Sequence, residues 1–238
     1  MGLKSIFVSA GEPSGDRYAA ALVRRLQAEY PEARFAGCAG EAMRVAGVEP
    51  VVRAEELAVV GLVEVLQHIP RIWARFRRLL AWIEQERPDL VILTDSPDFH
   101  LRLARRIRRL KVPIVYFVAP QVWAWRPWRV GLLREYVDLL LCIFPFEESF
   151  FRVRGVRAVY IGHPLTSLVR VESSRADFFG RHELDSQLPL VAILPGSRPD
   201  EAKRHLSLTA EAARWVAGHR PCQFVFAAPN REAAQLWR

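Results

Sequence analysis

Two aspartates stand where a predicted buried strand ends. Residues 90–93 (LVIL) form a continuous apolar run that predicts a strand buried on both faces, and Asp95 and Asp98 follow it within a short polar turn. The carboxyl ends of parallel strands are where open α/β sheets bind their ligands. A carboxylate placed there can take a proton from a reacting hydroxyl group. Capping of the following helix is the simpler alternative for either aspartate.

A second predicted strand, Pro113–Val118, leads into a loop rich in tryptophan and arginine. Aromatic faces stack on sugar rings, and guanidinium groups bind phosphate. Core packing beneath the loop is the alternative. The residues concerned are Trp123, Trp125, Trp128, Arg126 and Arg129.

The turn after the first predicted strand, Ser5–Ala10, carries the polar residues Glu12, Ser14 and Asp16. We expect Ser14 or Asp16 to cap a helix over Arg17–Tyr30, and the exposed N–H groups there are able to hold an anion. The glycines of this turn do not have the GxGxxG spacing, so the sequence does not predict a dinucleotide site.

Two later turns also end predicted strands. His163 precedes a proline, which holds it extended, and it either bonds a substrate oxygen or ties its loop to neighbouring backbone. Further on, Gly196, Ser197 and Arg198 follow a strand over 190–194. A glycine that allows close approach, a helix N-terminus and an arginine fork together favour phosphate binding, although a simple turn between strand and helix is the alternative.

The alternation of strands and helices predicts an α/β fold with parallel sheets. A polar, charged stretch predicts a boundary, giving a first domain over 1–168, a linker over 169–188 and the start of a second domain over 189–238. The other predicted strands are 34–40, 137–143, 158–161 and 223–227, and the other predicted helices are 41–46, 70–85, 99–110, 147–153, 201–218 and 230–238.

Composition limits the class of protein. The chain of 238 residues has a net charge of +8, carried almost entirely by arginine, which favours an anionic partner. Its three cysteines lie far apart without zinc or redox spacing, which is typical of a reduced cytosolic protein. No signal segment and no apolar run long enough to span a bilayer are evident in the sequence. The apolar stretch Val59–Leu66 and an arginine stripe (Arg71, Arg75, Arg78) predict a surface that lies on an anionic membrane, and a solvated helix face is the alternative.

Seven motifs in order resemble the lipid-A-disaccharide synthase family, which consists of inverting glycosyltransferases. The resemblance implies a GT-B fold of two Rossmann-like domains with parallel sheets. It also implies transfer from UDP-2,3-diacylglucosamine to 2,3-diacylglucosamine 1-phosphate on the cytoplasmic face of the inner membrane, without metal or cofactor. The motifs are SAGEPSGD (9–16), GLVEVL (61–66), DSPDF (95–99), PQVWAWR (120–126), FPFE (144–147), IGHPL (161–165) and LPGSR (194–198).

The resemblance also implies roles for single residues. Asp98 matches the proposed general base, and Arg198, with Gly196 and Ser197, matches the donor side. Glu12 matches an acidic residue at a cleft between the domains, and His100 stands where the family usually has asparagine. The other candidate cleft residues are Ser14, Asp95, Trp123, Arg126 and His163.

The family runs well beyond the length of this chain, so we expect an incomplete second domain, and poor solubility or no turnover in isolation. The sequence leaves open whether the protein forms a homodimer. The competing interpretations are another GT-B enzyme such as a UDP-sugar epimerase, an inactive fragment that only binds anionic lipid, and an arginine-rich nucleic-acid-binding module. The last is disfavoured because the arginines lie on separate predicted helices, and because the aspartates at the strand ends would have no role in nucleic-acid binding.

Overall fold

The computed structural model describes residues 2–57, 62–196, 199–228 and 231–236. It divides into two compact units, Met1–Leu168 and Val169–Arg238, and each is described by itself. Among the described residues, no helix combines the length and the apolar character needed to cross a membrane.

The first unit contains a seven-stranded parallel sheet in the order β3-β2-β1-β4-β5-β6-β7. This confirms the predicted α/β class. The order reverses beside β1, so the loops after β1 and β4 meet at the position where such sheets bind ligands. The strands are β1 (Ser5–Ala10), β2 (Arg34–Ala39), β3 (Glu49–Arg53), β4 (Leu90–Thr94), β5 (Ile114–Phe117), β6 (Leu139–Cys142) and β7 (Ala158–Tyr160).

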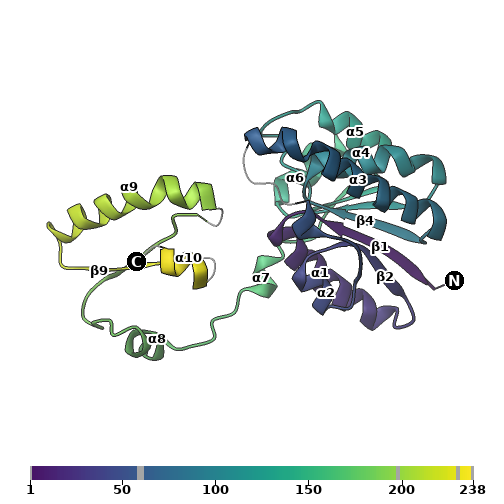
Figure 1. Ribbon diagram of the computed structural model, residues 1–238. Coiled ribbons are helices and arrows are strands. Elements are labelled where there is room, and N and C mark those ends of the chain that lie inside the picture. The colour runs from purple at the N-terminus through teal and green to yellow at the C-terminus, as the bar shows by residue number, and fades with distance from the viewer. Residues whose placement is uncertain (1, 58–61, 197–198, 229–230, 237–238) are drawn as a thin grey trace. The chain divides into compact units, whose positions relative to one another are not determined.

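Helices cover both faces of this sheet. Helices α1 and α2 lie on one face, whereas α3, α4 and α5 lie on the other (Figure 1). Because side chains alternate along a strand, Ile6 and Val8 of β1 pack towards α1 and Phe7 packs towards α3. The helices are α1 (Pro13–Glu29), α2 (Glu41–Val45), α3 (Leu62–Glu86), α4 (Pro97–Ile107), α5 (Arg129–Tyr136), α6 (Pro145–Arg152) and α7 (Leu165–Leu168).

The structure corrects several predicted boundaries. Helix α1 begins at Pro13, four residues earlier than expected, because proline is favoured in the first turn of a helix. Helix α3 begins at Leu62 and continues through Pro70, which was expected to start it. Strand β3 and helix α5 were not predicted. Part of the predicted membrane segment, residues 59–61, lies outside the described residues.

The second unit contains a parallel pair of strands, β8 (Leu190–Ile193) and β9 (Gln223–Phe226). They are accompanied by α8 (Arg175–Arg181), α9 (Pro199–Ala217) and α10 (Arg231–Leu236). Helix α8 lies within the stretch predicted as a linker, and the Ser174 side chain caps it by accepting from Asp177 N–H at 3.1 Å.

Candidate functional site

Asp95 joins the loops that follow β1 and β4. In the sheet Ala10 is aligned with Thr94, which brings the next residues of both strands side by side. The Asp95 carboxylate accepts from Gly11 N–H at 2.9 Å and from Glu12 N–H at 3.1 Å. A Cβ atom at Gly15 would lie 1.8 Å from Asp95 Oδ2, so the β1–α1 turn approaches this closely only because glycine stands there. Asp95 therefore holds the two loops together.

The environment of Asp95 is unfavourable for a charge. Burial raises the pKa of its carboxyl to about 7, and the hydrogen bonds from Gly11, Ser96 and Glu12 only partly oppose this rise. Asp95 and Ser96 also adopt φ values of 56° and 38°, a left-handed conformation that is uncommon outside glycine. Such strain persists only where surrounding contacts fix it, and it is often found at functional sites.

A buried histidine supports the same corner. His100 Nδ1 lies 2.9 Å from the backbone oxygen of Asp95, and its Nε2 lies 2.8 Å from Ser9 Oγ. Because a carbonyl oxygen only accepts, Nδ1 carries the proton and Nε2 accepts from the Ser9 hydroxyl. The Tyr116 hydroxyl donates to the same oxygen of Asp95. Burial lowers the pKa of His100 to about 4, so the ring is neutral near pH 7.

Asp98 lies one helical turn away and is exposed. Its carboxylate accepts from Arg126 Nη1 at 2.9 and 3.1 Å, and from Arg129 Nη2. The Asp98 side chain is 63% exposed, whereas the Arg129 side chain is 4% exposed. Asp98 does not cap α4, because the N-cap is Ser96 and no side chain caps this helix. The capping alternative is therefore wrong for Asp98.

The tryptophans of the β5–α5 loop have different surroundings. The Trp125 ring lies 4.5 Å from the Arg126 guanidinium and 5.3 Å from that of Arg129. The Trp123 indole instead donates to Glu147 at 3.1 Å and contacts the Phe146 ring edge to face. Trp128 is 67% exposed. Trp123 thus packs against α6, and Trp125 covers the arginines that hold Asp98.

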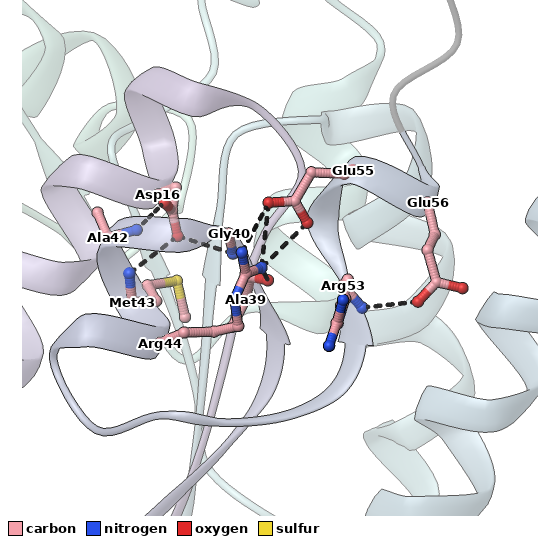
Figure 2. Close-up of polar contacts among 9 residues, drawn as sticks. All are labelled: Asp16, Ala39, Gly40, Ala42, Met43, Arg44, Arg53, Glu55 and Glu56. Carbon is pink, nitrogen blue, oxygen red and sulfur yellow. Dashed lines mark hydrogen bonds and ion pairs between the residues drawn. The ribbon is translucent and has the colours of Figure 1, made fainter.

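Asp16 has a role that differs from the predicted one. It is buried, and it accepts from the backbone N–H groups of Gly40, Ala42 and Met43 at 2.8, 2.8 and 3.2 Å (Figure 2). It therefore caps α2 rather than α1. Helix α1 has Glu12 as its N-cap without a side-chain cap, and Ser14 is exposed, so the predicted capping of α1 is wrong.

A cavity of about 470 Å³ lies beside the β1–α1 turn. Its lining includes Glu12, Arg17, Arg24 and Glu41, together with Glu55. Arg44 of α2 pairs with Glu55 at 3.0 Å and also donates to Ala39 O, and both contacts are drawn in Figure 2. Glu12 thus lines a cavity near the carboxyl ends of the strands, where Asp95 also lies.

His163 ties its own loop together. Its Nδ1 accepts from Leu165 N–H at 3.2 Å. The ring lies 5.7 Å from Phe144 and 6.2 Å from Tyr18 of α1. The structure thus shows the loop-tying role that was one of the two alternatives.

The structure describes only one of the three residues that were predicted to bind the sugar donor. Gly196 has a φ of 138°, and a Cβ atom there would lie 2.6 Å from Glu201 Cγ, which explains the glycine. Ser197 and Arg198 lie outside the described residues. Among the residues that the structure does describe, no group of three His, Cys, Asp or Glu side chains is placed to hold a metal ion.

Several solved structures share this fold. A MnaA–UDP co-structure from S. aureus has a TM-score of 0.67 at 15% identity, covering 98% of this chain and 65% of that one. A putative UDP-N-acetylglucosamine 2-epimerase from Listeria monocytogenes has a TM-score of 0.64 at 13% identity, covering 100% and 65%. The calicheamicin glycosyltransferase CalG4 has a TM-score of 0.56 at 17% identity, covering 95% and 66%. The fold is that of the GT-B class.

Sequence comparison narrows the class to a family. A model of the family described as lipid-A-disaccharide synthetase matches residues 6–236. The lipid-A-disaccharide synthase of Solibacter usitatus is 55% identical over 210 residues, which are 88% of this chain and 55% of the relative. That of Acidobacterium capsulatum is 44% identical over 231 residues, which are 97% and 58%. The chain belongs to the lipid-A-disaccharide synthase family, and it spans somewhat more than half the length of these curated relatives.

Proposed function

We propose that this chain supplies the acceptor-binding half of a lipid-A-disaccharide synthase. The reaction joins UDP-2,3-diacylglucosamine to 2,3-diacylglucosamine 1-phosphate and releases UDP. The family supports this proposal, and the single structural observation that carries it is the placement of Asp98. This carboxylate is exposed in the first turn of α4, directly after the left-handed residues Asp95 and Ser96 that follow β4, where His100 donates to the backbone oxygen of Asp95.

In the proposed reaction Asp98 is the general base. The 6-hydroxyl oxygen of the acceptor attacks the anomeric carbon of the donor, the bond from that carbon to the phosphate oxygen breaks, and UDP leaves with the electron pair. Asp98 takes the hydroxyl proton as the new bond forms. Such a positioned base contributes a factor of roughly 10² to 10⁴ to the rate. The donor diphosphate is proposed to bind at Gly196, Ser197 and Arg198.

We further propose that α3 contacts the anionic cytoplasmic surface of the inner membrane. Ile69 and Trp73 of this helix are 50% and 49% exposed, and Arg71 and Arg78 are exposed beside them. Arg75, predicted to belong to the same stripe, instead pairs with Glu56 at 2.6 Å. Flotation with anionic liposomes tests the proposal: binding should weaken in the double variant Arg71→Gln, Arg78→Gln, and unchanged binding would contradict it.

A chimera tests the proposed function, because the curated relatives are longer than this chain. In it, residues 1–168 replace the corresponding part of the Solibacter usitatus synthase. We expect this protein to form the disaccharide 1-phosphate and UDP from the two acylated substrates in detergent micelles, with the intact relative as the positive control. No product, while the relative is active and the chimera is folded, would contradict the proposal. Epimerisation of UDP-N-acetylglucosamine without an acylated acceptor would favour the epimerase alternative.

A further inference from the structure

Asp98 already has cationic partners in the free chain. The guanidinium groups of Arg126 and Arg129, here called the arginine pair, contact both of its carboxylate oxygens. These three contacts take up most of the roughly four lone-pair positions of this carboxylate, so a substrate hydroxyl group has to compete with the guanidinium groups for it. The proposed base is therefore largely occupied until something else binds the arginine pair.

The arginine pair has the properties of a phosphate site. Arg129 is almost completely buried, Trp125 lies over both guanidinium groups, and Arg126 keeps 38% of its side chain exposed. Two cations against one carboxylate leave one positive charge in excess. A phosphomonoester carries close to two negative charges and three acceptor oxygens, and it fits guanidinium forks better than a single carboxylate does.

We infer that Arg126 and Arg129 bind the phosphate group of a sugar phosphate, and that Asp98 occupies this site until the phosphate displaces it. The ligand follows from the proposed function, in which the acceptor is an amino-sugar phosphate. Binding then frees the base only when a phosphorylated substrate is present. The donor diphosphate has the same chemistry, and the experiment separates the two sources.

The test is an equilibrium titration of the chain, followed by ³¹P NMR, with glucosamine 1-phosphate, UDP and inorganic phosphate as separate ligands. Replacing Asp98 by asparagine removes the internal competitor. Asp98→Asn should therefore bind glucosamine 1-phosphate roughly three- to tenfold more tightly, the range expected when an ion pair of intermediate exposure no longer competes. Arg126→Gln should weaken binding by a similar factor.

A matched ion pair provides the control. Arg109 contacts Glu84, and their side chains are 70% and 35% exposed. Glu84→Gln and Arg109→Gln should leave the affinity unchanged. The inference is overturned if Asp98→Asn binds no more tightly than the unmodified chain, or if the control variants change the affinity as much. Tighter binding of UDP alone by Asp98→Asn would assign the same site to the donor.

A second measurement covers the case in which Asp98→Asn is unstable, since the variant leaves the buried Arg129 without this carboxylate. Inorganic phosphate should then raise the melting temperature of Asp98→Asn more than that of the unmodified chain, and an equal rise in both proteins would overturn the inference. Neither measurement needs turnover. A chimera that makes no disaccharide therefore bears on the proposed function alone, and a failed titration bears on this inference alone.

Discussion

Two junctions between loops lie at the carboxyl ends of the strands and are built differently. The β1–β4 junction joins the loops that follow β1 and β4, and the β4–β5 junction joins the start of α4, after β4, to the loop that follows β5. At the first, the Asp95 carboxylate accepts backbone N–H groups of the β1–α1 turn, and His100 is fully buried beneath it. At the second, the Asp98 side chain is exposed and pairs with the partly exposed Arg126 and with the buried Arg129. Two aspartates three residues apart thus have opposite surroundings.

This difference indicates a division of labour. Backbone hydrogen bonds in a buried corner are costly to break, so the β1–β4 junction fixes the position of the chain. The Asp98–Arg126 ion pair lies near solvent, where such pairs contribute little to stability and exchange readily, so the β4–β5 junction is able to bind a ligand. Each prediction below alters one junction and leaves the other intact.

The largest expected effect on stability comes from Asp95→Ala. This change leaves the N–H groups of Gly11 and Glu12 without their acceptor, which should lower the free energy of unfolding by about 2 to 4 kcal/mol. Arg126→Ala should cost less than about 1 kcal/mol, because its pair with Asp98 lies near solvent. Urea unfolding of both variants measures the difference. Equal losses would show that the two junctions do not differ as described.

Gly15→Ala probes the same junction from the β1 side. A Cβ atom at this position would collide with the Asp95 carboxylate, so we expect a loss of about 1 to 3 kcal/mol by overpacking. Gly131→Ala is the control, since a Cβ atom there meets nothing within 4 Å. Thermal unfolding compares the two, and a Gly15→Ala variant as stable as the control would contradict the close approach of the loops.

The pH dependence of stability separates Asp95 from His100. The folded-state pKa of Asp95 is raised from 3.8 to about 7, so its contribution is complete below pH 3.8 and is lost as the pH rises through about 7. The folded-state pKa of His100 is lowered from 6.5 to about 4, so its contribution is present above pH 6.5 and is lost as the pH falls through about 4. Between pH 4 and 6.5 the two trends oppose each other.

Replacing either Asp95 or His100 should reveal the pH dependence of stability that the other residue contributes. In His100→Gln, stability should rise as the pH falls from 7 to 4, and in Asp95→Asn it should fall between pH 6.5 and 4. Each slope should be at most about 1.4 kcal/mol per pH unit, the value for one proton. Unfolding free energies at four or five pH values suffice, and identical profiles for the two variants would rule out this assignment.

The smallest expected effect concerns Trp125. Its ring covers the arginine pair, and a cation–π contact at a partly exposed site is worth about 0.5 to 1 kcal/mol. Trp125→Ala should weaken glucosamine 1-phosphate binding by about two- to fivefold, which is the same energy expressed as affinity, with little change in melting temperature. Trp128→Ala is the control. Equal effects of the two changes would mean that neither ring supports the site.

The sequence predicts the scaffold well where the pattern is local. Apolar runs such as 90–93 locate the buried strands, and the placement of Asp98 at a strand end follows from the same pattern. Strand β3 was missed because Glu49 and Pro50 begin it and only two of its residues are buried. Helix α3 was predicted to start at Pro70, but it begins at Leu62 and runs through the proline, and Phe76 and Leu79 of its later turns lie in the core.

The contacts that define the site could not be predicted, because they join distant segments. Asp16 caps α2 across 24 to 27 residues, and His100 reaches Ser9 across 91. The unusual histidine after the DSPDF motif was a visible signal, but nothing in strand β5 marked Tyr116 as a partner of Asp95. Arg126 and Arg129 were predicted to meet phosphate, and their contacts with Asp98 span 28 and 31 residues of sequence.

The chimera of residues 1–168 with the Solibacter usitatus synthase also tests most directly whether Asp98 is the base. Asp98→Asn, assayed well below its melting temperature with saturating substrates, should lower the rate of disaccharide formation by a factor of roughly 10² to 10⁴. Glu84→Gln should keep the full rate. An Asp98→Asn chimera that forms disaccharide within about threefold of the unmodified rate would contradict the account, since a base worth that factor would then not be at this position.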